Sequence, residues 1–244
     1  MGDPFFHINW LEAGKSSNMR KKSMSFWGLL KSDLDRYRCV EGRSYLVAFV
    51  MAPGTLASAS YRLGQLIWNL RGPAWLILPL KALHVFLDRA VQVVTGIAIA
   101  PTARIGPGLY IGHFSGIFVG ADVEIGSNCD LHQGVTIGVS VHGDKLGTPR
   151  LGDRVYVAPG AKIFGRVVIG DDAIIGANSV VTASLQPRAV AIGIPGRVIS
   201  YQGSFDYIKY HGVEADPERC TSLKMRSYKL ASLRLDAASD SILT

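Results

Sequence analysis

Cysteine is scarce in this chain, and charged residues are fewer than in an average soluble protein. The three cysteines, Cys39, Cys129 and Cys220, lie far apart and form no C-x-x-C pair. This spacing argues against a structural zinc site and a disulfide framework, and it suits a reducing compartment. Charged residues make up 18% of the chain and hydrophobic residues 48%, so we expect a folded globular protein rather than a disordered one.

A secretory signal and a long hydrophobic run are also lacking. In residues 1–25 the basic cluster follows the apolar residues, and no apolar core comes after it. The most apolar stretch, residues 75–87, is too short to span a bilayer and contains Lys81 and His84. We therefore expect a cytoplasmic protein.

Positive charge is concentrated in the first part of the chain. Residues 1–95 carry 12 Lys/Arg against 6 Asp/Glu, whereas residues 96–244 carry 14 against 13. Such a basic, apolar-rich region can attract an anionic acceptor or an anionic membrane surface, which predicts a peripheral contact at the inner face of the membrane. An ordinary solvated basic face is the alternative. No nucleic-acid partner is expected.

The first hundred residues divide into a flexible lead, residues 1–25, and a helical region, residues 26–96. Leu30, Leu34 and Tyr37 recur at helical spacing, as do apolar residues between 61 and 70. A Gly-Pro break at residues 72–73 separates two helical runs. We expect the aromatic residues of this region to lie in the core.

From Ile97 the hydrophobic pattern changes to a period of six. A small or apolar residue stands four positions after each aliphatic one, and glycine often follows the aliphatic position. The aliphatic positions are Ile99, Ile105, Ile111, Val119, Ile125, Leu131, Ile137, Leu151, Val157, Ile163, Ile169, Ile175 and Val181. The small or apolar positions include Ala103, Leu109, Ser115, Val123, Cys129, Val135, Val155, Ala161, Val167, Ala173 and Ser179.

This period predicts a solenoid over residues 97–199, because an amphipathic helix would repeat near 3.6 residues. Each hexapeptide forms a short strand and a corner, three of them make a triangular coil, and the aliphatic residues point inward. Burial of such side chains, at about 1.5–3 kcal/mol each, is then the dominant stabilising contribution. Residues 200–244 form a C-terminal extension, in which 223–235 are expected to be helical.

The rhythm breaks twice. Eight residues rather than six separate Ile111 from Val119, and fourteen separate Ile137 from Leu151, so residues 139–150 must contain a projecting loop. Interruptions of a solenoid are where binding sites tend to be built. Since the two breaks are one coil apart, we expect them to border one cleft.

Four runs stand out in this region: IGPGLYIGHFSGIFVG at 105–120, QGVTIG at 133–138, IGANSV at 175–180 and GIPGR at 193–197. Together they resemble the serine acetyltransferase branch of the hexapeptide-repeat acyltransferases. The resemblance covers roughly residues 60–200. It implies a mainly β fold, a left-handed parallel β-helix, and acetyl transfer from acetyl-CoA to a hydroxyl group without a metal.

The resemblance also implies functional residues. His113 matches the catalytic histidine of the family, and a neutral imidazole suits removal of a hydroxyl proton near pH 7. His142, in the long loop, is a candidate second catalytic histidine, and His132 is a weaker one that we expect to point outward. Coenzyme A in this family lies in a groove between coils of neighbouring subunits. The positions that match its contacts are Gly138, Val139, Ser140, Pro159, Ala177 and Arg197.

This chain departs from the family on the acceptor side. The Asp-Ile-His-Pro stretch of the family reads Ala-Ile-Ala-Pro at 98–101, and the aspartate before the catalytic histidine is Gly112. The histidine of the Arg-His-Pro triplet is replaced within 147–149. A zwitterionic serine would leave its charged groups poorly paired, at about 1–3 kcal/mol each. We therefore expect a sugar hydroxyl of a polysaccharide precursor as the acceptor, with L-serine as the alternative.

The sequence also allows two functions other than acetyl transfer. The chain could be a non-catalytic trimeric scaffold, which the missing aspartate favours and His113 opposes. It could resemble the carbonic anhydrases of this fold, which need three histidines on zinc, although the spacing of His113, His132 and His142 does not resemble that pattern. The resemblance implies a homotrimer or a dimer of trimers acting on a small-molecule or glycan acceptor.

Overall fold

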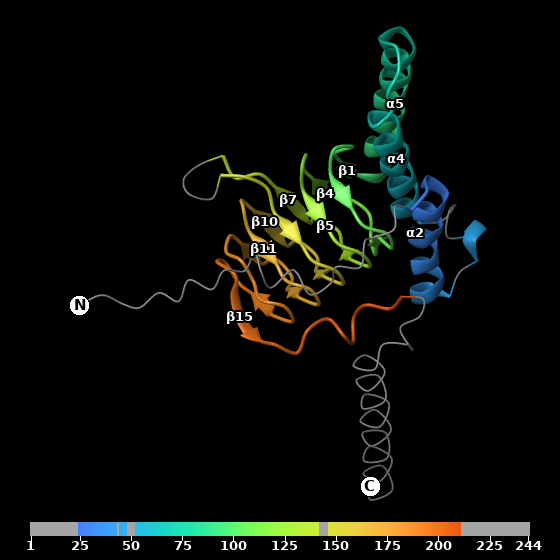
Figure 1. Cartoon of the computed structure of the whole chain (residues 1–244). Coiled ribbons are helices and arrows are strands. Elements are labelled where there is room, and N and C mark those ends of the chain that lie inside the picture. Colours follow the sequence, from blue (N-terminus) through green and yellow to red (C-terminus); the bar gives the residue numbers. More distant parts are fainter. Residues whose placement is uncertain (1–23, 43, 48–51, 142–145, 211–244) are drawn as a thin grey trace, which may run out of the picture.

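The computed structural model describes residues 24–42, 44–47, 52–141 and 146–210. Helices precede a solenoid of short parallel strands and lie at the end where its first coil begins (Figure 1). The helix expected at 223–235 lies outside the described residues, as does most of the expected lead.

Apart from the segments at 42–52 and 139–149, the connections between the elements are short. The helices are α2 (Phe26–Glu41), α4 (Pro53–Trp68) and α5 (Ala74–Thr95). The strands are β1 (Ile97–Ile99), β2 (Arg104–Ile105), β3 (Tyr110–Ile111), β4 (Ile117–Val119), β5 (Glu124–Ile125), β6 (Asp130–Leu131), β7 (Thr136–Gly138), β8 (Arg150–Leu151), β9 (Tyr156–Val157), β10 (Lys162–Phe164), β11 (Val168–Ile169), β12 (Ile174–Ile175), β13 (Val180–Val181), β14 (Val190–Ile192) and β15 (Arg197–Ser200). The period of six residues therefore begins directly after α5.

Local sequence determines where the helices begin and end. The hydroxyl oxygen of Ser25 caps α2 by accepting a hydrogen bond from the backbone N–H of Gly28 at 3.2 Å. Glycines in the left-handed conformation, Gly42 with φ 69° and Gly96 with φ 66°, end α2 and α5. A side chain at Gly96 would also meet the backbone of Ser115, at 2.9 Å, so this glycine allows the first coil to start close against the helix.

The strands form three sheets, one on each side of a triangular coil. Their orders are β1-β4-β7-β10-β13, β2-β5-β8-β11 and β3-β6-β9-β12-β14-β15. All pairs are parallel except β14 with β15. Successive coils stack in register, as in the pairing of Ile99 with Val119 and of Val119 with Ile137. Each backbone group thus bonds to the coil above or below it.

The predicted aliphatic ladder is buried at every position, together with most of the small residues. Cys129 is a packing residue within it, fully buried, and burial raises the pKa of its thiol to about 12. Ser115 is an exception to the prediction, because it is exposed and has φ 84°. The two extra residues of the first break push Ser115 out of the corner, and the buried Ile117 takes the inner position.

The expectation that both breaks border one cleft within a chain is wrong. The first break forms the corner between β3 and β4, whereas the long loop leaves the corner between β7 and β8. These corners lie at opposite edges of the sheet that contains β4 and β7, because the second break comes four strands after the first, one strand more than a full coil. Two backbone hydrogen bonds between Ser140 and Gly147, at 3.1 and 3.2 Å, close the base of the loop.

A buried ion pair fastens the helices to the first coils. Arg62 of α4 donates two hydrogen bonds to the carboxylate of Asp33 of α2, at 2.8 and 3.0 Å. Its other donors reach the carbonyl oxygens of Ile105 and Gly106, both at 2.7 Å. Asp33 in turn accepts the backbone N–H of Leu109 at 2.9 Å. The pair therefore joins two helices and one coil corner in a single network.

The aromatic residues of the helical region are only partly in the core. Tyr37 and Tyr61 are buried, but Trp27, Trp75 and Phe86 are more than 70% exposed. The expectation of a purely internal role is wrong for these three, because helical spacing shows which residues share a face and not what covers that face. Among the described residues, no helix combines the length and the hydropathy needed to cross a membrane.

The last coil is covered by a returning segment. Strand β15 pairs antiparallel with β14 and ends that sheet. On the neighbouring side, the carbonyl oxygen of Gly193 accepts the N–H of Val180 at 3.0 Å, and the N–H of Gly196 donates to the carbonyl oxygen of Val180 at 2.8 Å. The segment thus occupies the hydrogen-bonding edges of two of the three sheets.

Candidate active site

One corner of the solenoid repeats through four coils and carries His113. Backbone hydrogen bonds of 2.9–3.0 Å link Gly134 to Ser115, Gly160 to Gln133, and Asn178 to Pro159 along this row. His113 and His132 therefore lie above one another on successive coils, at the same edge of the β1-β4-β7-β10-β13 sheet.

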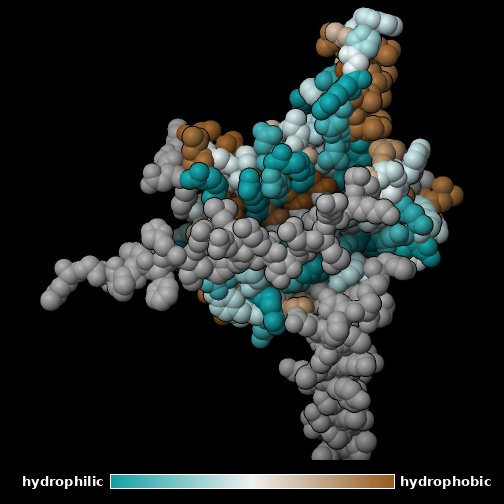
Figure 2. Space-filling model, in the orientation of Figure 1, coloured by the Kyte–Doolittle hydropathy of each residue, from teal (hydrophilic) through white to brown (hydrophobic). Residues whose placement is uncertain are grey.

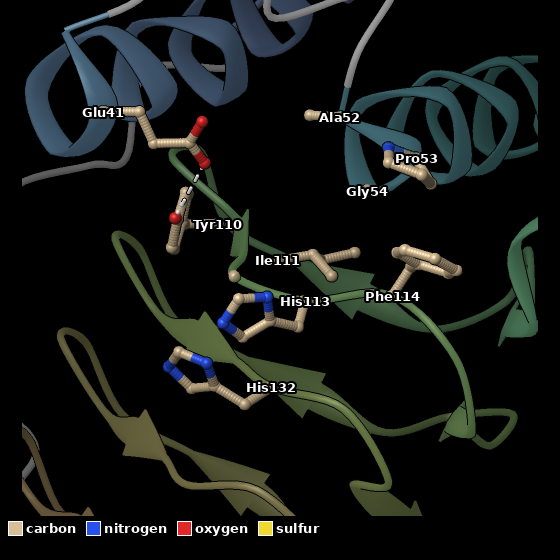
Figure 3. A pocket seen from close by; sticks show the side chains of 10 residues that line it. Glu41, Ala52, Pro53, Gly54, Tyr110, Ile111, His113, Phe114 and His132 are labelled. Atoms are coloured by element: carbon tan, nitrogen blue, oxygen red, sulfur yellow. Dashed lines mark hydrogen bonds between the residues drawn. The ribbon is translucent and has the colours of Figure 1, made fainter.

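A hollow of about 430 Å³ opens beside the two histidines (Figure 3). The end of α2 and the start of α4 form one wall, and the coil corner forms the other. Its lining residues are Glu41, Ala52, Pro53, Gly54, Tyr110, Ile111, Gly112, His113, Phe114 and His132. His113 is exposed, so its imidazole is available to a bound molecule.

His132 lies beside His113 with its ring half-buried, although we expected it to point outward. The two ring centroids are 6.4 Å apart, and Tyr156 stacks on the other side of His132 at 4.8 Å. Burial, and secondarily the charge of His113, lowers the pKa of His132 to about 4. Its Nε2 is buried without a hydrogen-bond partner. The imidazole is therefore neutral at physiological pH.

Gly112 makes room for this second imidazole. A Cβ atom at position 112 would lie 2.6 Å from both Cε1 and Nδ1 of His132. The family resemblance implies an aspartate at position 112. Glycine stands there in this chain and leaves space for the His132 ring. In this chain an imidazole, rather than a carboxylate, stands beside the candidate base.

Glu41 brings a carboxylate to the hollow that the sequence patterns did not reveal. It is the last residue of α2, and its Oε1 accepts a hydrogen bond from the hydroxyl of Tyr110 at 3.0 Å. Burial, and then the charge of Glu41, raises the pKa of that hydroxyl above its ordinary value. The sequence does not indicate Glu41 as a site residue, because 71 positions separate it from Gly112 along the chain. Only the docking of α2 on the coils brings the two residues together.

The candidate coenzyme A residues do not line this hollow. Pro159 and the exposed Ala177 lie on the same row of corners as the histidines, on the following coils. Gly138, Val139 and Ser140 follow the opposite edge of the same sheet, and Arg197 is exposed on β15. His142 lies outside the described residues. Among the described residues, no group of three or more His, Cys, Asp or Glu side chains is arranged to hold a metal ion.

The stacked coils and the histidine corner define the class of hexapeptide-repeat transferases. Residues 148–183 match the family described as bacterial transferase hexapeptide (six repeats). The chain is 36% identical over 160 residues to the serine acetyltransferase of Mycobacterium tuberculosis, a match that covers 64% of this chain and 66% of that enzyme. The chain belongs to the serine acetyltransferase family.

Solved structures agree with this assignment. The soybean serine acetyltransferase apoenzyme superposes with a TM-score of 0.62 and 32% identity, over 72% of this chain and 69% of that one. A serine acetyltransferase in complex with CoA gives 0.60 and 30%, over 72% and 70%. The solenoid is the left-handed parallel β-helix that the sequence resemblance implied.

Replacement of Gly112 by alanine is expected to force the His132 ring from its place. The new methyl group would overlap the imidazole, so we expect a loss of about 1–3 kcal/mol of unfolding free energy, together with reduced turnover. Chemical denaturation measures the first effect. Gly120→Ala is the matched control, because its Cβ would meet nothing closer than 3.5 Å. Equal stability of the two variants would contradict the packing argument.

The low pKa of His132 predicts a loss of stability in mild acid. An unfolded histidine titrates near pH 6.5, whereas the folded pKa is about 4. The contribution is complete above pH 6.5 and is lost as the pH falls toward 4, because only the unfolded chain takes up the proton. Unfolding free energies measured across this range are expected to fall more steeply in the wild type than in His132→Asn. Identical slopes would show that His132 is not buried as a neutral group.

Proposed function

We propose that the protein transfers the acetyl group of acetyl-CoA to a hydroxyl group, with His113 as the general base. The observation that carries this proposal is the exposed imidazole of His113 in a hollow whose neighbouring imidazole is held neutral. As the acceptor oxygen attacks the thioester carbonyl, His113 takes its proton. The C–S bond then breaks, and the thiolate of CoA takes up a proton from the imidazolium.

Acetyl-CoA is proposed to lie along the sheet edges next to this corner. Pro159 and Ala177 continue the row of His113 with small side chains, which let a pantetheine arm approach the backbone. Gly138, Val139, Ser140 and Arg197 are the other proposed contacts, with Arg197 available to a phosphate. Arg197 lies on β15 of another sheet, and the remaining residues lie on two opposite edges of the β1-β4-β7-β10-β13 sheet. A homotrimer whose neighbouring subunits complete the groove fits this placement. The relative solved with CoA supports this co-substrate.

L-serine is the first acceptor to test, because the relatives are named as serine acetyltransferases. The carboxylate of Glu41 suits the ammonium group of an amino acid. One observation favours a sugar hydroxyl instead: the ten residues that line the hollow include no lysine or arginine to bind a carboxylate. Tyr110, Glu41 and the two imidazoles are hydrogen-bonding groups that suit a polyhydroxyl acceptor.

Release of free CoA thiol by the full chain tests the proposal. Acetyl-CoA is supplied with L-serine, with ethanolamine, which keeps the ammonium and lacks the carboxylate, or with monosaccharides. Preference for L-serine over both identifies the serine reaction, and preference for a monosaccharide identifies the sugar reaction. If no acceptor raises thiol release above that of His113→Ala, the protein is not a transferase of this kind and the scaffold alternative stands.

A further inference from the structure

The helices α4 and α5 form a hairpin that extends away from the solenoid (Figure 1). Its inner side is held by polar contacts. Nε2 of His84 in α5 donates to the carbonyl oxygen of Ser60 in α4 at 3.1 Å, and the Ser60 hydroxyl donates to Asp88 at 2.7 Å. These contacts place His84 and Asp88 on the side of α5 that faces α4, so the remaining side of α5 faces outward.

The outward side of α5 is apolar along its whole length. We call this surface the apolar face of α5; its exposed members are Trp75, Leu76, Leu80, Leu83, Phe86, Leu87, Val93 and Val94. At 100° per residue these side chains fall within one side of the helix, with Lys81 and Asp88 on the opposite side, and no charged residue lies among them. Figure 2 shows apolar surface along the hairpin. The helix has 22 residues, so the face is about 33 Å long.

Cationic residues lie at the tip of the hairpin and at one border of this face, whereas Lys81 lies on the side of α5 that faces α4. From 63 to 95 the chain has three cationic residues, Arg71 at the tip of the hairpin, Lys81 and Arg89, and one acidic residue, Asp88. Asp88 accepts hydrogen bonds from Ser60 and Gln92 on the inner side, at 2.7 and 2.6 Å. The charge offered to a partner is therefore cationic.

Aromatic residues mark the tip of the hairpin. Trp75 is 76% exposed, and the ring of Trp68 lies under the ammonium group of Lys81, with Nζ 4.7 Å from the ring centroid. Tryptophan beside cationic side chains is the combination found where a protein meets lipid headgroups. A second copy of this chain fits less well, since symmetric packing of two such faces would bring the cationic residues Arg71 and Arg89 of both copies to one interface.

We propose that the α4–α5 hairpin docks on an anionic lipid surface, with the apolar face of α5 inserted into the interface and Arg71 and Arg89 against the headgroups. Three charged residues within α5 favour a helix that lies along the surface. Docking would bring the histidine corner, on the coils next to α5, close to membrane-bound acceptors.

Flotation of the full chain with lipid vesicles tests this proposal. One set contains phosphatidylcholine and phosphatidylglycerol, and the other contains phosphatidylcholine alone. We expect binding to the first set that weakens with salt, and at least roughly tenfold weaker binding by Phe86→Glu, which places a charge in the apolar face. Arg71→Gln is expected to weaken binding about fivefold. Val168→Glu, which changes an exposed apolar residue of the solenoid, is the matched control with wild-type binding.

Acetyl transfer to a soluble acceptor is measured on the same samples, so that folding and docking are separated. Phe86→Glu and Arg71→Gln are expected to retain that activity. The proposal is overturned if the wild type binds neither set of vesicles, or if Phe86→Glu binds as the wild type does. It is also overturned if sedimentation shows that the wild type self-associates through this face and Phe86→Glu separates the copies, since a second copy would then cover it.

Discussion

Replacement of His113 by alanine is expected to lower kcat by about 10²–10⁴-fold, the usual contribution of a general base. A hydroxyl group is a weak nucleophile until its proton is removed. The neighbouring imidazole of His132 cannot take over this role easily, because burial holds its pKa at about 4 and makes it a poor base near pH 7. Initial rates of CoA release with saturating acetyl-CoA and acceptor measure the effect.

Two further variants make this result specific. His113→Asn keeps a polar side chain of similar size without a basic nitrogen, so it is expected to lose as much activity as alanine. Arg104→Ala removes one partner of the ion pair with Glu124, which is largely exposed, and should turn over at the wild-type rate. If His113→Ala kept more than roughly a tenth of the wild-type kcat, the base would have to be another group.

The second large effect concerns stability. Arg62→Ala is expected to lower the unfolding free energy by about 3–5 kcal/mol, because it leaves the carboxylate of Asp33 buried without its cation. Both side chains are nearly fully buried, and four hydrogen bonds of the guanidinium are lost at once. Burial already raises the pKa of Asp33 against the opposing effect of Arg62, so this carboxyl is expected to become protonated in the variant.

Arg104→Ala again supplies the comparison. Its partner Glu124 and Arg104 itself are solvated, and an exposed pair contributes about 0–1 kcal/mol. Urea denaturation of both variants is expected to show a clearly larger loss for Arg62→Ala. An equal loss would mean that the helices are not held on the first coil by this network. Arg62→Lys, which keeps the charge and cannot make the forked contacts, should fall between them.

The solenoid could be predicted from the sequence because its order is local. Inward positions repeat every six residues, and each aliphatic residue from Ile99 to Val181 is where the period places it. The failure at Ser115 has a local cause as well, since an insertion shifts the inner position by two residues. The six-residue period does not show at which corner of the triangle an interruption falls. For this reason the sequence predicts one cleft for both breaks, although they lie at different corners.

The candidate site was harder to predict because it is assembled from distant segments. His113 follows from its place in a recognisable run, but Glu41 reaches the hollow only through the docking of α2. From the sequence, His132 is expected to point outward. In the structure its ring lies in the space that the absent side chain of Gly112 leaves open. Trp75 is exposed because none of the described elements packs over it. The hydrophobic period of a helix does not show whether another element will cover its apolar face.

The returning segment at the last coil has a consequence for solubility. A stack of parallel strands ends in unpaired N–H and C=O groups, and an open end can add further chains into fibres. Helices α4 and α5 lie against the first coil, while β15 and the turn before it occupy the last one. Growth of the stack by end-to-end addition is therefore hindered at the first coil by the helices and at the last coil by strand pairing along two of its three sides.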